Sequence, residues 1–245
     1  MPDTHSLSTK NIPANERLIF ALDVPSADAA KQLVETLGDS VSFYKLGLEL
    51  FMAGGYFELI EWLNQCGKKV FADLKFYDVP QTVESAVQQL ARHPGVTFAT
   101  VHAADNLLTA ACRVKQHLKI LAVTVLTSLD QSDLNDLGFQ ADIKQVVLSR
   151  ARRALQLGCD GVISSGLEAP ELRQQLGQQL LIVTPGIRPV HNTDDQKRTV
   201  NVEQAFYNGA DYIVVGRPIK AHHGFDTPRA AALSIQQRIA TLFNS

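Results

Sequence analysis

Charged side chains gather in two short segments of this sequence. Asp73, Lys75 and Asp78 lie within DLKFYDVPQT, and Lys45 lies in the earlier segment FYKLG. Asp73 and Lys75 are two residues apart, so on a β-strand their side chains project to the same face. Nearby carboxylates keep a lysine protonated, and a protonated lysine that faces an apolar pocket is a general acid. Lys75 is therefore the candidate proton donor of a Lys/Asp charge cluster.

The alternative explanation for these charges is a structural ion network that only covers the end of the strands. Burying a charge costs several kcal/mol unless it is paired, whereas Leu, Val or Ala would fill the same positions without that cost. The retention of several carboxylates and amines in and just after the strands therefore favours a chemical role.

The segments TPGIRP and YIVVGRPI, near the end of the chain, are candidates for binding phosphate. Gly216 allows close backbone approach, and Arg217 supplies a planar fork of donors. Pro185 and Arg188 lie in the preceding segment, and the last strands of a (β/α)8 barrel often carry a phosphate site. A surface salt bridge is the ordinary alternative for a single arginine at a strand end.

Two further segments place polar side chains after strands. Residues 188–201, RPVHNTDDQKRTVN, form a long polar connection that contains Gln196 and is a candidate lid, with a solvated surface loop as the alternative. Thr127 and Ser128 end VTVLTS, where their hydroxyls could contact a polar ring or cap the next helix. His102 is expected to hydrogen-bond neighbouring loops and is not assigned to catalysis.

The elements that must position these residues read as eight βα units. Short runs rich in Val, Ile, Leu and Phe alternate with amphipathic stretches, as in a parallel sheet. Helical patterns include 27–37, 83–91, 143–157 and 229–243. The expected strands are Leu18–Asp23, Phe43–Gly47, Lys69–Lys75, Phe98–His102, Ile120–Leu126, Gly161–Ser164, Leu181–Thr184 and Tyr212–Gly216.

Eight repeats in 245 residues favour a single-domain α/β protein, a (β/α)8 TIM barrel. An open, doubly wound sheet would also alternate strands and helices, but no GxGxxG follows the first strand. We expect a flexible N-terminal tail over residues 1–16 and the barrel over residues 17–245. Gly67, Gly158 and Gly209 each separate a helix from the next strand, as helix-terminating glycines do.

The composition of the chain limits the kinds of molecule that it is expected to bind. A net charge of -2 offers no broad basic surface for nucleic acid, and no apolar run is long enough to span a membrane. The cysteines at 66, 112 and 159 lack the paired spacing of zinc or redox motifs, and the adjacent His222 and His223 would diverge on regular structure, so no metal site is expected. These features predict a cytoplasmic protein that acts on a small molecule.

The same segments resemble those of the orotidine 5'-phosphate decarboxylase family, over nearly the whole chain after the tail. DLKFYDVPQT at 73–82 is similar to the family signature D-x-K-x-x-D-[IV]-P-x-T, which is highly specific when Lys45 accompanies it. The supporting segments, in the family's order, are ALD ending at Asp23, VTVLTS ending at Ser128, TPGIRP at 184–189, DQKR at 195–198 and VGRP at 215–218.

The resemblance implies that orotidine 5'-monophosphate is decarboxylated to UMP without metal or cofactor. Lys75 would protonate C6 of the pyrimidine within a tetrad of alternating charge. A homodimer is implied, in which Asp78, Val79 and Thr82 contribute across the interface. The other implied site residues are Lys45 and Asp73 in the tetrad, Asp23 and Lys45 at the ribose, Ser128 at the pyrimidine, Gln196 and Arg217 at the phosphate, and Thr127, Pro185, Arg188 and Gly216 beside them.

Two rival functions use the same fold. The 3-keto-L-gulonate 6-phosphate decarboxylase group shares D-x-K-x-x-D but uses a magnesium ion and carries Glu where Lys45 stands. A non-catalytic barrel that senses UMP is the rival from a different class, although a pure binder has no need for a costly charge cluster. Lys45 and the complete tetrad argue against both.

Overall fold

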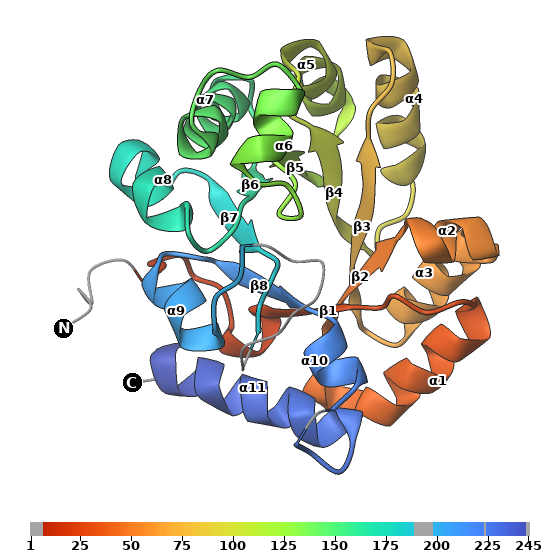
Figure 1. Cartoon of the computed structure of the whole chain (residues 1–245). Helices are drawn as coiled ribbons and strands as arrows, with labels where there is room; N and C mark the ends of the chain where they lie inside the picture. The colour runs from red at the N-terminus through yellow and green to blue at the C-terminus, as the bar shows by residue number, and fades with distance from the viewer. Residues whose placement is uncertain (1–6, 189–197, 223, 244–245) are drawn as a thin grey trace.

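The computed structural model describes residues 7–188, 198–222 and 224–243 of the chain (Figure 1). Its eight strands are all parallel, and each pairs with the next until β8 pairs with β1. The predicted (β/α)8 barrel is therefore confirmed. The strands are β1 Leu18–Ala21, β2 Phe43–Gly47, β3 Lys69–Phe76, β4 Val96–His102, β5 Lys119–Val123, β6 Gly161–Ile163, β7 Leu181–Thr184 and β8 Tyr212–Val215.

Helices surround the barrel (Figure 1), and within the described residues none of them is long and apolar enough to cross a membrane. The α-helices are α1 Ala27–Leu37, α2 Leu48–Ala53, α3 Tyr56–Gln65, α4 Pro80–Leu90, α5 Asp105–Val114, α6 Gln131–Asp136, α7 Ile143–Gln156, α8 Ala169–Leu176, α9 Val202–Tyr207, α10 Arg217–Lys220 and α11 Pro228–Phe243. The described residues also form two 3-10 helices, η2 Ala14–Glu16 and η3 Gly38–Ser40.

Local sequence signals explain where the helices start and stop. The side chain of Ser26 accepts a hydrogen bond from the Ala29 amide at the start of α1, which satisfies an otherwise unpaired donor. Gly67, Gly158 and Gly209 follow helices with φ of 68°, 83° and 100°. Residues other than glycine rarely adopt such angles, so the predicted helix-terminating role of these glycines is confirmed.

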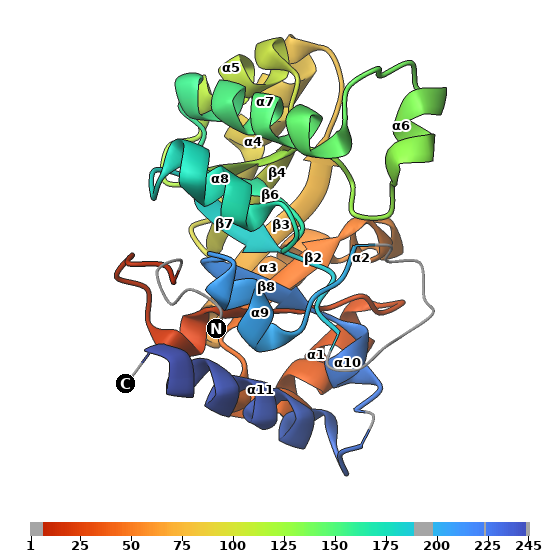
Figure 2. The ribbon, with the colours of Figure 1, turned by 60° about the vertical axis from the view of Figure 1, so that its left-hand side comes forward.

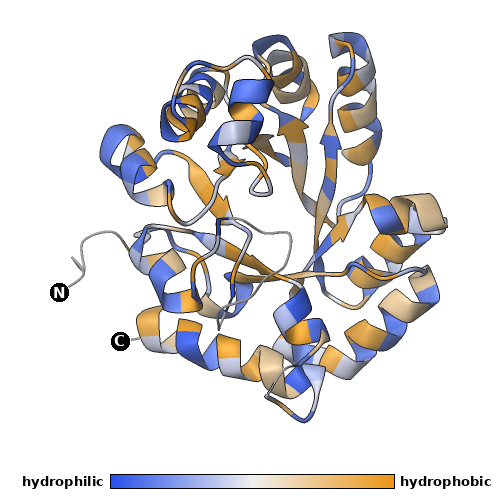
Figure 3. Cartoon of the chain, in the orientation of Figure 1, coloured by the Kyte–Doolittle hydropathy of each residue, from blue (hydrophilic) through white to orange (hydrophobic). Residues whose placement is uncertain are grey.

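The apolar residues form two layers. One cluster fills the barrel interior, and a larger one lies between the strands and the surrounding helices. Figure 3 shows the corresponding pattern, with largely hydrophobic strands and helices that alternate between hydrophobic and hydrophilic residues. Strands buried on both faces explain why the sequence shows continuous apolar runs rather than strict alternation.

Inward-facing positions change character along the strands. Phe43 and Phe71 belong to the barrel-interior cluster, and two residues later on the same strands stand Lys45 and Asp73. Because alternate residues of a strand share a face, the charged side chains lie one layer above the apolar one, at the C-terminal end of the barrel. The apolar layer thus forms the floor of a charged site.

The N-terminal segment differs from the expectation of a tail over residues 1–16. Ser8 is buried and donates a hydrogen bond to the carboxylate of Asp211, and the Lys10 ammonium lies 3.1 Å from the same group. Asp211 itself is fully buried just before β8, so it needs these partners. From Ser8 onward the segment is attached to the barrel, and its polar composition reflects that ion network.

Candidate functional site

A pocket of about 330 Å³ lies at the C-terminal ends of the strands. Figure 2 shows α2, α6 and α10, which follow β2, β5 and β8, on one side of the molecule. This end of a (β/α)8 barrel is where active sites form. The predicted site residues that line the pocket are Asp23, Lys45, Asp73, Lys75, Thr127, Ser128, Pro185, Arg188, Gly216 and Arg217.

Four of these side chains form a row of alternating charge. The Lys45 Nζ lies 3.2 Å from Oδ1 of Asp23 and 3.5 Å from Oδ2 of Asp73. The Lys75 Nζ lies 2.9 Å from the same Oδ2 of Asp73. Asp73 therefore pairs with two amines at once, and Lys75 stands at one end of the row with Asp23 at the other.

The row keeps its inner members ionised although they are buried. Burial alone would raise the pKa of Asp73, but Lys45, then Lys75, and the hydrogen bonds from Lys75 and Thr100 outweigh it and leave that pKa below its ordinary value. For Lys45, burial would lower the pKa, and Asp73 and Asp23 raise it above the ordinary value instead. Asp73 is thus a carboxylate and Lys45 an ammonium at neutral pH.

The strand that carries Asp73 and Lys75 is irregular, although their side chains meet as predicted. Lys75 has φ of 49°, and the pairing with β4 shifts between Ala72 and Phe76. The hydroxyl of Thr100 on β4 accepts from the Lys75 amide at 2.9 Å and donates to Asp73 at 3.0 Å. Thr100 was not predicted; its signal is a polar residue two positions after Phe98, on the inward face of β4.

Asp78, Val79 and Thr82 do not join the row within this chain. All three are exposed, Asp78 and Val79 on the turn from β3 into α4 and Thr82 in the first turn of α4, and the Asp78 carboxylate accepts from the Val79 amide at 2.6 Å. Val79 keeps 63% of its surface open to solvent. The structure therefore separates the fourth predicted member of the tetrad from the other three.

The candidate phosphate site lies where β7 and β8 end. A side chain at Gly216 would place its Cβ 3.2 Å from the Cβ of Ala21, which is tighter than most such contacts, so glycine avoids crowding beside the pocket. Arg217 follows directly and is exposed, while Arg188 is buried after β7 and donates to the Ile187 carbonyl at 2.9 Å. Two guanidinium groups and a glycine backbone thus border one end of the pocket.

Part of the candidate lid lies outside the described residues, including Gln196. At its C-terminal end, Arg198 is buried and its guanidinium lies 2.5 Å from the carboxylate of Glu168, which is also buried. The same guanidinium donates to the carbonyls of Val125 and Leu126 after β5. Neither Arg198 nor Glu168 was predicted to have a role, because a long-range ion pair has no signal in a single sequence.

Thr127 and Ser128 both line the pocket, as predicted, with Thr127 the more buried. His102 ends β4 but is not among the lining residues, and its ring centroid lies 4.9 Å from that of Tyr77. Burial, then Lys75 and Arg150, lower the pKa of His102. Its imidazole is therefore neutral at pH 7.

A metal site would need several converging ligands. Within residues 7–188, 198–222 and 224–243 no group of three or more His, Cys, Asp or Glu side chains could hold an ion. The carboxylates of the pocket instead face ammonium groups. The arrangement suits proton transfer and electrostatic stabilisation of a small anionic ligand.

A family model, related sequences and a solved structure all indicate the same family for this chain. Residues 16–234 match the model of the orotidine 5'-phosphate decarboxylase / HUMPS family. An orotidine 5'-phosphate decarboxylase of Methylococcus capsulatus is 61% identical over 97% of both chains, and one of Stenotrophomonas maltophilia is 47% identical over 93% of this chain and 94% of its own. The crystal structure of the Lactobacillus acidophilus orotidine 5'-phosphate decarboxylase has a TM-score of 0.79 and 35% identity, and the match covers 94% of this chain and all of that one.

Proposed function

Because this chain belongs to the orotidine 5'-phosphate decarboxylase / HUMPS family, we propose that it decarboxylates orotidine 5'-monophosphate to UMP in pyrimidine biosynthesis. The observation that carries the proposal is the row Asp23, Lys45, Asp73 and Lys75 at the C-terminal end of the barrel, which ends in the ammonium group of Lys75. Such a row would present positive charge to the carbon on which negative charge develops in the reaction.

The chemistry requires stabilisation of a carbanion. The bond between C6 of the pyrimidine and its carboxylate breaks, carbon dioxide leaves, and the electron pair stays on C6, where the ring offers no electron sink. The Lys75 Nζ donates a proton to C6, which gives UMP and a neutral amine that regains its proton from water. Asp73 accepts a hydrogen bond from that Nζ at 2.9 Å, which holds the proton donor in place before the reaction.

Asp73 has a second role near the leaving group. A substrate carboxylate beside this buried, ionised carboxylate would be repelled, and the loss of carbon dioxide relieves the repulsion. Preorganised stabilisation by the two ammonium groups acts in the same direction on the transition state. We assign the larger share to the ammonium groups, because they are held at 2.9 and 3.5 Å from Asp73 before any substrate binds.

The remaining pocket residues are proposed to bind the nucleotide. Asp23 and Lys45 would hold the ribose hydroxyls, and Thr127 and Ser128 would contact the pyrimidine. Phosphate would bind at the ends of β7 and β8. Because this contact is remote from the reacting carbon, its binding energy can be used to orient the pyrimidine ring. The residues proposed for that end are Pro185, Arg188, Gly216, Arg217 and, from the candidate lid, Gln196.

A second copy of the chain is proposed to complete the site. Asp78, Val79 and Thr82 are exposed here, and Asp78 lies outside the row. If two chains pack with these turns at each other's pockets, Asp78 extends the partner's row by one negative charge. The buried fraction of Val79 would then rise as well, which accounts for an aliphatic side chain at this position.

Lys45 also argues against the magnesium-dependent reaction of the 3-keto-L-gulonate 6-phosphate decarboxylase group. Its ammonium lies between Asp23 and Asp73, at the position where the magnesium-dependent group carries Glu. A cation bound there would be repelled by a positive charge only a few ångströms away. We therefore propose a reaction that needs neither metal nor cofactor.

The protein is proposed to act in the cytoplasm. All three cysteines carry free thiols, even though the sulfur atoms of Cys112 and Cys159 lie 3.5 Å apart. Free thiols at this separation agree with a reducing compartment.

One assay tests the proposed function. Purified protein is mixed with orotidine 5'-monophosphate in excess EDTA, and loss of the orotate chromophore is followed together with UMP formation. Rapid conversion supports the metal-independent decarboxylase. If well-folded protein gives no conversion with EDTA but does so with added Mg²⁺, the metal-independent mechanism is wrong; binding of UMP without conversion under either condition would support the non-catalytic binder.

A further inference from the structure

We infer that Thr100 is a positioning residue, which holds Asp73 and Lys75 in the arrangement needed for proton transfer. The inference rests on the proposed function, since it concerns the same reaction. Thr100 lies on β4, is fully buried, and does not line the pocket. Its role is therefore to act on residues that touch substrate and not on substrate itself.

The first observation is a break in the pairing of β3 with β4. Ala72 pairs with Ala99, and the next paired residue on β3 is Phe76, which pairs with Val101. Residues 73–75 thus stand opposite the single residue Thr100. The chain accommodates the two extra residues by turning at Lys75, whose φ of 49° is uncommon for a residue other than glycine.

The second observation is how the Thr100 hydroxyl fills that break. Its oxygen accepts from the Lys75 amide at 2.9 Å, so this amide is satisfied by a side chain in place of a strand carbonyl. Without the hydroxyl, a backbone donor would lose its partner where β3 is already irregular. The hydroxyl therefore stabilises the backbone turn that directs the Lys75 side chain.

The third observation concerns the other end of the same hydroxyl. A hydroxyl has one hydrogen, and that of Thr100 is donated to Oδ1 of Asp73 at 3.0 Å. The other oxygen, Oδ2, receives the ammonium groups of Lys75 and Lys45. The hydrogen bond from Thr100 holds Oδ1 of Asp73 toward β4, so Oδ2 is the oxygen that faces the lysines. One side chain thus controls both the backbone of Lys75 and the rotamer of Asp73.

The hydrogen bond from Thr100 is the smallest of the influences on the pKa of Asp73, after burial and the two lysines. Removing the hydroxyl should consequently leave Asp73 ionised and the pocket charged. What changes is the geometry of the donor and its partner, to which proton transfer is sensitive. The chemical step should suffer while binding of the ribose and phosphate is retained.

Two substitutions separate this role from simple filling of space. Thr100→Val keeps the shape and removes the hydroxyl, whereas Thr100→Ser keeps the hydroxyl and removes a methyl group. We expect Thr100→Val to lower kcat by about 10- to 100-fold, with KM and the affinity for UMP within about threefold of the unsubstituted protein. Thr100→Ser should restore most of kcat.

Thr124→Val is the matched control. Thr124 is also buried, and its hydroxyl donates to the Ile163 carbonyl outside the charge row, so its loss should leave kcat nearly unchanged. Equal kcat values for Thr100→Val and the unsubstituted protein, or equal losses for Thr100→Val and Thr100→Ser, would overturn the inference. Equal losses in the two Val variants would overturn it as well.

The controls keep this test apart from that of the proposed function. If the unsubstituted protein does not convert orotidine 5'-monophosphate, the proposed function fails, whatever the variants do. If Thr100→Val does not fold, Thr100→Ala and Thr100→Ser carry the same contrast: recovery of kcat by Ser alone supports positioning, and equal kcat values in both reject it.

Discussion

Lys75 combines two properties that rarely coincide in one residue. Its backbone has a positive φ, and its ammonium group is held 2.9 Å from a buried carboxylate. A positive φ in a residue other than glycine persists only where the surrounding structure imposes it, and such residues cluster at functional sites. At the scale of single residues, the unusual backbone angle and the paired ammonium group both indicate that Lys75 is the functional residue, with its Nζ as the proton donor.

Replacing Lys75 by alanine should remove the chemistry and spare binding. We expect Lys75→Ala to lower turnover by roughly 10⁴-fold or more, because both the donated proton and the charge opposite C6 are lost. UMP should still bind, since its phosphate and ribose contacts lie elsewhere in the pocket. Steady-state kinetics and calorimetric titration with UMP measure the two effects. Lys119→Ala, at an exposed position where β5 begins, is the control; turnover by Lys75→Ala at the level of this control would reject the assignment.

Arg217 is proposed to act on a different part of the ligand. Arg217→Ala should weaken UMP binding by about 1.5 to 3 kcal/mol, roughly 10- to 150-fold in Kd, which is the scale of a charge-assisted hydrogen bond. Uridine, which lacks the phosphate, should lose little affinity with the same substitution. Titrations of both ligands into Arg217→Ala and into an exposed control, Arg92→Ala, measure the difference. Equal affinity of the unsubstituted protein for UMP and uridine would contradict the phosphate site.

At the scale of elements, much of the barrel could be predicted because each strand is a buried apolar run. The predicted and observed bounds of β2 and β7 coincide, and α1 begins and ends where its pattern indicates. Predicted strands such as Ile120–Leu126 were too long, since β5 ends at Val123 and the apolar run continues into the connection after it. Apolar character alone does not show where strand pairing stops.

The site was predictable to the extent that its residues stand at strand ends. Lys45, Asp73 and Lys75 meet because parallel strands bring their C-terminal ends together. The irregularity of β3 at Lys75 and the hydroxyl of Thr100 opposite it depend on pairing between strands, which a single sequence does not contain. The same limit explains why the pair Arg198 and Glu168 was missed.

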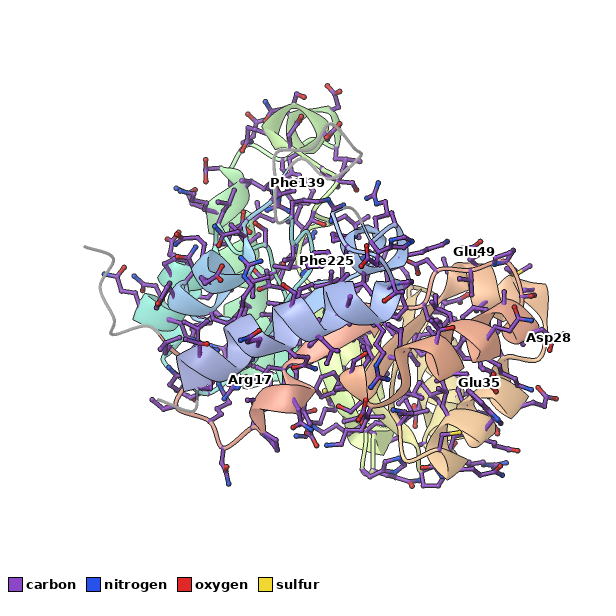
Figure 4. All side chains as sticks on the ribbon, turned by 90° about the horizontal axis from the view of Figure 1, so that it is seen from below. Arg17, Asp28, Glu35, Glu49, Phe139 and Phe225 are labelled. Carbon is purple, nitrogen blue, oxygen red and sulfur yellow. The ribbon has the colours of Figure 1, made fainter. Side chains whose placement is uncertain are left out.

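The opposite end of the barrel depends on one buried carboxylate. Asp211 accepts from Arg173 at 2.7 Å, from the Ile182 amide at 2.8 Å and from Lys10 at 3.1 Å. It thereby joins the N-terminal segment, α8 and the beginning of β8. Arg17 donates to the Asp211 carbonyl and places its guanidinium 3.7 Å from the centroid of the Phe243 ring. Figure 4 labels Arg17 next to α11, the helix that carries this ring.

Removing that carboxylate should destabilise the fold without touching the pocket. Asp211→Ala leaves the buried guanidinium of Arg173 without its counter-charge, so we expect the free energy of unfolding to fall by about 3 to 5 kcal/mol. Asp39→Ala is the matched control, because Asp39 pairs with Arg229 at the surface and should cost no more than about 1 kcal/mol. Urea unfolding followed by circular dichroism measures both, and equal losses would contradict the role of the network.

At the scale of the whole molecule, the proposed site is larger than one chain. The barrel supplies Asp23, Lys45, Asp73 and Lys75 from its own strand ends, while the turn before α4 presents Asp78 and Val79 outward. In a twofold dimer the same patch on each chain contacts the other, so each turn could complete the partner's pocket and leave two equivalent sites. Catalysis would then require assembly, whereas folding of the barrel would not.

Mixing two inactive variants tests this sharing. In a dimer of Asp78→Asn with Lys75→Ala, one site has both substitutions and the other has neither. Random exchange of equal amounts should therefore restore about one quarter of the activity, because half of the dimers are mixed and each has one intact site. The rate of UMP formation, followed as mass spectrometry monitors subunit exchange, measures the recovery.

The matched control for this mixture is Lys45→Ala with Lys75→Ala. Both lysines belong to the same chain's pocket, so every site in that mixed dimer lacks one of them and no activity should return. Recovery in the first mixture alone requires that Lys75 and Asp78 of one site come from different chains. Complete exchange without recovery in the first mixture would show that each barrel works with its own Asp78, and the turn before α4 would then have to move toward Lys75 when substrate binds.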